Sequence, residues 1–227
     1  MELDHACNFA GSILPFLRLP HLKKLRVFSL GPGQVHNLTD TLPQYGSALL
    51  AGATKLWCCF DTYPHSTQVN LSGNGVDVSL SAYYRMTDAT TVDWLSDQAL
   101  IPFGQIEDLK VEGSPSTADP PISVFALKNL RVLRVTPWNP QFTEEFFRLL
   151  RPGPGTGVPC PSLREIEYTC YGPQEPLPRS LISLIKERKR AGHQLRLFCL
   201  LVRYGSGWDL VGELRGRVGE IRVGTMG

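Results

Sequence analysis

Apolar residues recur along the chain in steps of three, three and two positions. The segments that show this spacing in full are Leu19, Leu22, Leu25 and Val27; Leu50, Ala53, Leu56 and Cys58; Phe103, Ile106, Leu109 and Val111; Leu127, Leu130, Leu133 and Val135; and Cys160, Leu163, Ile166 and Tyr168. The final step of two is the period of one face of a β-strand, and the earlier residues belong to the turn before that strand. A shortened form is Val218, Ile221 and Val223.

Leu195 and Leu197 predict a further strand whose preceding turn has lost its pattern. Strands are therefore expected near 25–29, 56–60, 108–112, 132–136, 165–169, 195–200 and 220–223. The alternating segment on both sides of Ser72-Gly73-Asn74-Gly75 predicts a β-hairpin at about 68–81. Because no such unit can bury its apolar face alone, the units must stack, with Leu25, Leu109, Leu133, Ile166 and Ile221 in one core.

Helical spacing of apolar residues lies between the strands, at 34–42, 91–99, 143–150 and 179–191. Thr143 is the expected N-cap of the third helix, Gly192 ends the fourth, and Asp209 is expected to cap a short last helix. The L-x-x-L-x-L spacing is that of leucine-rich repeats. We therefore expect an α/β fold and a single domain over 1–227. It would be an irregular leucine-rich-repeat-like solenoid with a curved, mostly parallel sheet, helices on the outer face and one inserted β-hairpin.

Four stretches, taken in order, resemble the C-terminal repeat region of fungal F-box domain-containing proteins: LPHLKKLRVFSLGPGQV, VNLSGNGVDVSLS, VPCPSLREIEYT and PLPRSLISLIKERKRAGHQL. In that family an N-terminal F-box docks on the adaptor of a cullin-type ubiquitin ligase, and the repeats are expected to hold substrates. The sequence departs from the family because no L-P-x-E-like helical segment precedes the first repeat. We therefore expect no binding to the ligase adaptor, and a truncated remnant without function is one alternative.

Residue patterns for catalysis, metals and cofactors are absent from the sequence. The cysteines at 7, 58, 59, 160, 170 and 199 form no C-x-x-C pair, and Cys58, Cys160 and Cys199 fall at apolar strand positions. The loop Gly153-Pro154-Gly155-Thr156-Gly157 lacks the Lys and Ser/Thr of a phosphate-binding loop. We expect no enzyme activity, metal or cofactor. Unpaired cysteines and the absence of a secretory signal or an 18-residue apolar run predict a cytoplasmic or nuclear protein without a membrane partner.

The repeat spacing also predicts which residues point away from the core, one per strand. These are Arg26, Trp57, Lys110, Arg134, Glu167, Arg196 and Arg222. Stacked repeats place such positions on the concave face, which is the usual binding surface. Because most of them are cationic, we expect a protein partner with acidic surfaces, although a solvated strand face also carries Lys and Arg.

Charge adds one further candidate, the basic cluster Lys186-Glu187-Arg188-Lys189-Arg190. It could serve as a nuclear signal or contact nucleic acid, but cations are also favoured at the end of a helix. The overall net charge of +2 is too small to indicate nucleic acid by itself. The sequence therefore predicts a non-catalytic protein-binding module, with a basic surface for nucleic acid as the alternative.

Overall fold

The structure is a computed structural model of the chain. It describes residues 2–3, 24–30, 50, 52–61, 66–83, 103–113, 124–137, 139–153, 155, 157–171, 176–203 and 208–226. Its strands are β1 (Glu2–Leu3), β2 (Lys24–Leu30), β3 (Lys55–Asp61), β4 (Ser66–Gly73), β5 (Val76–Tyr83), β6 (Asp108–Gly113), β7 (Val132–Thr136), β8 (Glu165–Cys170), β9 (Leu197–Val202) and β10 (Glu220–Thr225). Its helices are α5 (Pro140–Leu149), α6 (Arg179–Arg190) and the 3₁₀ turns η2 (Phe103–Gln105), η3 (Val124–Ala126) and η4 (Trp208–Leu214).

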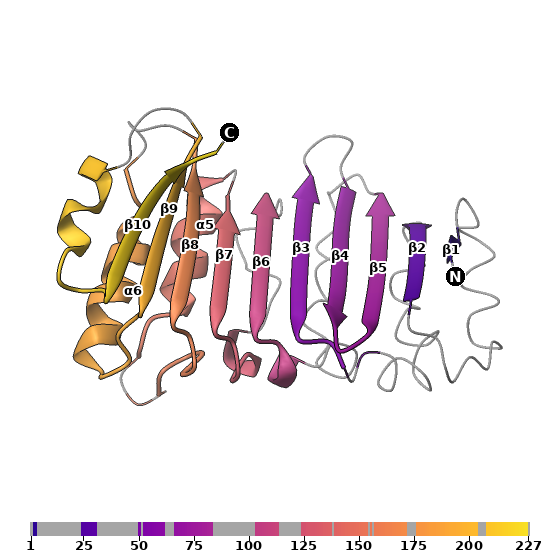
Figure 1. Ribbon diagram of the computed structural model, residues 1–227, viewed down its shortest axis with the longest axis horizontal. Helices are drawn as coiled ribbons and strands as arrows, with labels where there is room; N and C mark the ends of the chain where they lie inside the picture. Colours follow the sequence, from indigo (N-terminus) through magenta and orange to yellow (C-terminus); the bar gives the residue numbers. More distant parts are fainter. Residues whose placement is uncertain are drawn as a thin grey trace.

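All the described strands belong to one open sheet, in the order β1-β2-β5-β4-β3-β6-β7-β8-β9-β10 (Figure 1). Neighbouring strands are parallel except where β4 pairs with β3 and β5. The expected α/β class and mostly parallel sheet are thus confirmed. The expected hairpin is β4–β5, and its turn residues Gly73, Asn74 and Gly75 all have positive φ. It lies within the sheet, between β2 and β3.

The segments with the full apolar spacing share one local structure wherever they are described. The second apolar residue donates its N–H to the C=O of the first: Ala53 to Leu50 at 2.9 Å, Ile106 to Phe103 at 3.2 Å, Leu130 to Leu127 at 3.2 Å and Leu163 to Cys160 at 3.0 Å. The carbonyl just before each strand then accepts two N–H groups from the next repeat. These acceptors are Thr54, Glu107, Arg131 and Arg164, and the respective donor pairs are Glu107 and Asp108, Arg131 and Val132, Arg164 and Glu165, and Arg196 and Leu197. The sequence repeat is therefore a structural repeat.

The inward residues of successive strands stand beside one another and form a continuous core. The first inward row includes Leu56, Leu109, Leu133, Ile166 and Phe198, each at most 1% exposed. The predicted core is confirmed for Leu109, Leu133 and Ile166, which belong to one cluster. Ile221 packs against that cluster but is only partly buried, and the side chain of Leu25 lies outside the described residues.

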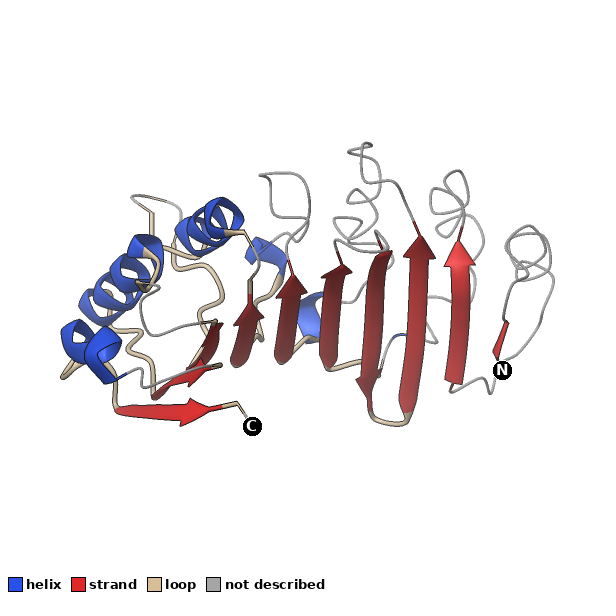
Figure 2. Cartoon of the chain, turned by 90° about the horizontal axis from the view of Figure 1, so that it is seen from above, coloured by secondary structure: helices blue, strands red, loops and turns tan. Residues whose placement is uncertain are grey.

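The described helices all lie on one side of the sheet, and the sheet curves toward its other side at β8–β10 (Figure 2). Three 3₁₀ turns and two α-helices therefore cover the convex face. The expected helices at 34–42 and 91–99 lie outside the described residues. The last helix, η4, is a 3₁₀ helix that begins at Trp208, so Asp209 lies inside it and does not precede it.

The N-cap of α5 is Asn139, which corrects the expectation for Thr143. The Asn139 side-chain oxygen accepts N–H groups from Gln141 at 2.8 Å and Phe142 at 3.4 Å, and Pro140 occupies the first helical position. Thr143 is buried inside the helix, and its hydroxyl donates to the Asn139 carbonyl at 2.8 Å. The Asn139-Pro140 pair indicates the start of the helix more strongly than Thr143 does, because proline fits only the first turn of a helix.

Helix α6 ends as expected, since Gly192 follows it with φ of +79°. Its Arg188 side chain is fully buried and donates to the carbonyls of Pro159 at 2.8 Å, Cys160 at 3.1 Å and Leu163 at 3.3 Å. Burial lowers the pKa of Arg188, with the nearby Cys160 opposing that shift and Arg164 adding to it. Arg188 thereby joins the convex helix layer to the turn before β8.

Candidate contact surface

The sheet face opposite the helices carries the residues that the sequence predicts as a site. Strand register places one residue from each of the strands β2 to β10 side by side in a central row: Arg26, Ser79, Asn70, Trp57, Lys110, Arg134, Glu167, Cys199 and Arg222. The structure thus brings six of the seven predicted residues into one row, although the side chain of Arg26 lies outside the described residues. The seventh, Arg196, is not in this row.

Arg196 lies one position before β9, and the outward residue of β9 in the central row is Cys199. The inward residues are Phe198 and Leu200, so Leu197 faces outward and the predicted alternation of β9 was wrong. Cys199 is accordingly half-buried on the concave face, whereas Cys58 and Cys160 are buried as expected. Burial and the neighbouring Glu167 raise the pKa of the Cys199 thiol, and Arg222 partly offsets them.

Arg196 instead belongs to the set of residues whose carbonyls link one repeat to the next. We call Arg131, Arg164 and Arg196 the entry row, since each directly precedes a strand and all three are exposed. Arg131 has Glu107 at 3.6 Å. Neither Arg164 nor Arg196 takes part in an ion pair with another described residue. A basic row therefore exists, but at the start of the strands.

The cations of the central row have acidic neighbours. Lys110 lies 2.7 Å from Glu112, and Arg222 lies 2.6 Å from Glu220. Arg134 contacts Asp108 and has Glu167 at 3.9 Å. The hydrogen bond with Asp108 raises the pKa of Arg134 despite the opposing effect of burial. Each of these three cations of the central row therefore already has an acidic partner within the fold.

Trp57 is the large aromatic side chain of the central row, and its neighbours hold its ring in place. The indole Nε1 donates to Glu112 Oε2 at 2.8 Å, and Lys110 Nζ lies 5.1 Å from the ring centroid, within cation–π range. Glu112 bonds both Trp57 and Lys110. A half-buried indole fixed in this way loses little side-chain entropy when a partner covers it.

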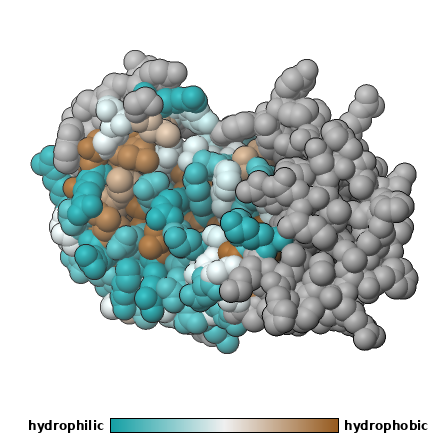
Figure 3. Space-filling view, turned by 45° about the vertical axis from the view of Figure 1, so that its right-hand side comes forward, coloured by the Kyte–Doolittle hydropathy of each residue, from teal (hydrophilic) through white to brown (hydrophobic). Residues whose placement is uncertain are grey.

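Apolar side chains occupy the same face beyond the central row. Leu197 and Leu201 of β9 point outward on either side of Cys199 and are half-buried, as is Val132 of β7. Figure 3 shows hydrophobic surface on the C-terminal part of the molecule, bordered by hydrophilic side chains. The concave face thus combines an ordered indole, apolar side chains and paired charges.

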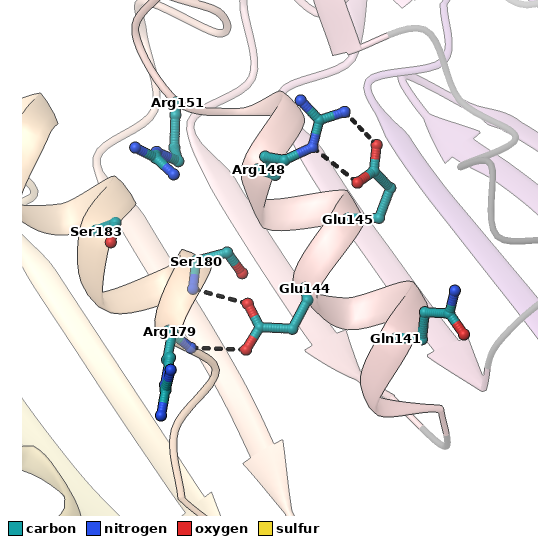
Figure 4. A pocket seen from close by; sticks show the side chains of 8 residues that line it. All are labelled: Gln141, Glu144, Glu145, Arg148, Arg151, Arg179, Ser180 and Ser183. Atoms are coloured by element: carbon teal, nitrogen blue, oxygen red, sulfur yellow. Dashed lines mark hydrogen bonds and ion pairs between the residues drawn. The ribbon is translucent and has the colours of Figure 1, made fainter.

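A second candidate site is a groove of about 380 Å³ between α5 and α6 (Figure 4). Most of its charged side chains already have partners within the fold. The Glu144 carboxylate accepts the backbone N–H groups of Arg179 and Ser180, each at 2.8 Å, while Arg148 pairs with Glu145. Glu144 thus caps α6, which has no cap of its own because Pro178 precedes it. The groove is a helix–helix junction without a free polar cluster among its described residues.

The basic cluster at 186–190 is likewise used within the fold. Lys186 binds Glu213 at 3.0 Å, Lys189 donates to the Gly216 carbonyl at 2.7 Å, and Arg188 is buried. A receptor or nucleic acid that reads the folded chain could not reach Arg188. These contacts support a structural use of the cluster, and its role as a nuclear signal stays a prediction.

Replacing Glu144 by glutamine is expected to lower the free energy of unfolding at pH 7 by about 0.5–2 kcal/mol, the usual range for a helix cap. Burial raises the pKa of Glu144, but the hydrogen bonds from Ser180 and Arg179 outweigh it and leave the pKa below its usual value. The stabilisation is therefore present above the ordinary glutamate pKa and is lost as the pH falls through the lowered one. Urea unfolding at several pH values should show the two proteins converging in acid. Glu145→Gln is the matched control, and an equal loss in both variants at pH 7 would contradict the capping role.

Comparison with known proteins identifies no relative: no family model matches the chain, and no curated protein or solved structure shows significant similarity to it. Within the described residues, no group of three or more His, Cys, Asp or Glu side chains could hold a metal ion. No helix in that part of the chain is long and apolar enough to cross a bilayer.

Proposed function

We propose that this protein is a non-catalytic protein-binding module of irregular leucine-rich-repeat-like architecture and that its concave strand face contacts the partner. The repeated turn and carbonyl pattern supports the repeat assignment, since four successive links from Thr54 to Arg164 use the same hydrogen bonds. The described helices lie on the opposite side of the sheet, so no described helix covers the concave face (Figure 2). Stacked repeats commonly bind partners through that face.

The observation that carries the proposal is Trp57, which lies half-buried on a middle strand of the concave face and is held by its neighbours. Tryptophan is enriched among the few residues that dominate binding energy at protein interfaces. The indole is held by Glu112 and Lys110, and Leu197 and Leu201 extend the apolar contact area along the face. We infer that the partner places apolar or aromatic side chains against this surface.

The preference for acidic partners, which the sequence analysis attached to the central row, fits the entry row better. Arg164 and Arg196 are exposed and make no ion pair with a described residue, whereas Lys110, Arg134 and Arg222 already have acidic neighbours. We therefore propose that acidic residues of the partner contact the entry row while its apolar residues cover Trp57. The planar guanidinium of arginine binds carboxylates in a bidentate manner.

The resemblance to fungal F-box proteins supplies a biological setting for this surface. In that family the repeats are expected to hold proteins that are to be ubiquitinated, so the proposed partner class is a substrate protein of a ubiquitin ligase. This part of the proposal rests on the resemblance alone.

Site-specific photo-cross-linking tests the proposed face. A photoreactive side chain is introduced at Val132, half-buried on the concave face, and separately at Gln141, exposed on α5. The same protein partner should be cross-linked from position 132 and not from position 141, and the reverse result would refute the proposal. Titration with mixed-sequence DNA and RNA tests the alternative, because nucleic-acid binding would weaken steeply as salt increases.

A further inference from the structure

The strand β10 is the last of the described sheet, and described residues pair with only one of its two edges. The N–H groups of Glu220 and Met226 donate to the carbonyls of Arg196 at 2.8 Å and Val202 at 3.1 Å. Because successive backbone groups of a strand point to opposite edges, the N–H and C=O groups of Ile221, Val223 and Thr225 point away from β9. No described residue pairs with that edge. Figure 2 shows η4 on the same side of the sheet as the other described helices.

The inward side chains of β10 give a second, independent sign of a missing neighbour. In the inward rows, Ile166 and Phe198 are at most 1% exposed, while Ile221 beside them is only partly buried. Val223 shows the same difference from Leu200. The apolar core is therefore open at the edge where backbone groups are also unpaired.

The usual protections of an edge strand are weak in β10. Residues 220–225 contain no proline, and the register with β9 shows no bulge. Its two charged residues, Glu220 and Arg222, lie on the concave face and bind each other at 2.6 Å. The addition of a strand to the edge would therefore leave neither charge without a partner.

We propose that β10 is the interface through which two copies of this chain associate, edge to edge and antiparallel, into one continuous sheet. A two-fold axis through Val223 matches all the free backbone groups, since Ile221 then faces Thr225 of the copy and Val223 faces its own equivalent. The same register places Gly224 opposite Arg222, which leaves room for the arginine side chain. This interface is separate from the concave face and does not depend on the proposed function.

Sedimentation velocity of the full chain, over a wide range of concentration, tests the proposal. The unaltered protein should form a dimer, and Val223→Pro should be a monomer, because proline removes an N–H that points to the free edge and none that bonds β9. Val223→Lys gives a second variant without a backbone change, and it should also be a monomer because two lysines would meet at the axis. Gln141→Lys adds the same charge on α5 and should remain a dimer.

Amide hydrogen exchange supplies the residue-level readout. Exchange at Ile221, Val223 and Thr225 should slow as the protein concentration rises, while Arg222 and Gly224 should not change, because their N–H groups already bond β9. A monomer at every concentration, or a dimer that persists in Val223→Lys, would overturn the proposal. Loss of partner binding with the dimer intact would affect only the proposed function.

Discussion

Replacing Leu133 by alanine is expected to lower the free energy of unfolding by about 2–5 kcal/mol, the range seen for large-to-small changes in protein cores. Leu133 is fully buried in β7, between Leu109 of β6 and Ile166 of β8. Both neighbours are held by strand hydrogen bonds on either side, so the core can close only part of the cavity. Urea unfolding followed by circular dichroism gives the measurement.

Val132→Ala is the matched control for this change. Val132 precedes Leu133 in the same strand but faces outward and is half-buried. Val132→Ala should lower the free energy of unfolding by clearly less than Leu133→Ala does. Equal losses in the two variants would contradict the observed register of β7 and, with it, the alignment of the core rows.

Replacing Arg188 by leucine is expected to destabilise the fold by on the order of 2–5 kcal/mol, because buried carbonyls lose their donors at roughly 1–3 kcal/mol each. The guanidinium serves the carbonyls of Pro159, Cys160 and Leu163, which form the turn before β8. Leucine fills part of the volume but donates nothing. Thermal and urea unfolding should both show the loss.

Arg190→Leu provides the comparison, since Arg190 lies in the same turn of α6 but is exposed. Exposed substitutions of this kind usually change stability by no more than about 0.5 kcal/mol. If Arg188→Leu lowered the free energy of unfolding as little as Arg190→Leu, the three carbonyls would have found other donors. Arg188→Lys should recover part of the stability because an ammonium can still donate to these oxygens.

The strands were predictable because burial repeats at fixed positions. Residues such as Leu109 and Leu133 follow the steps of three, three and two, and stacking in parallel register aligns them side by side. Each of the seven predicted strands overlaps an observed one, from β2 to β10. The position of the hairpin in strand order was not predictable, because the sequence shows that β4 and β5 pair with each other but not which strands flank them.

The register of β9 could not be read from simple alternation. Its sequence, Leu197-Phe198-Cys199-Leu200-Leu201-Val202, is apolar at every position, so both faces fit a buried row. The step of three from Leu195 to Phe198 was the usable signal. Following it would have placed Cys199 in the central row and Arg196 before the strand.

The charge pairing on the concave face was predictable from the sequence, but only by considering every outward residue of a strand and not one residue per strand. Asp108, Lys110 and Glu112 alternate along β6 and all face outward, so Lys110 has an acidic residue two positions away on each side. The capping of α6 by Glu144 had no signal in the sequence, because it depends on how two helices pack.

The most direct test of the concave face as the contact surface is the partner's dissociation constant for two truncations on opposite faces. Trp57→Ala should weaken binding by about 30-fold or more, which corresponds to roughly 2 kcal/mol for a central interface residue. Arg148→Ala, on the helix face, should leave the constant nearly unchanged. Unfolding of each variant is measured alongside, so that a loss of fold is not mistaken for a loss of contact. Unaltered binding by folded Trp57→Ala, or a larger loss in Arg148→Ala, would contradict the account.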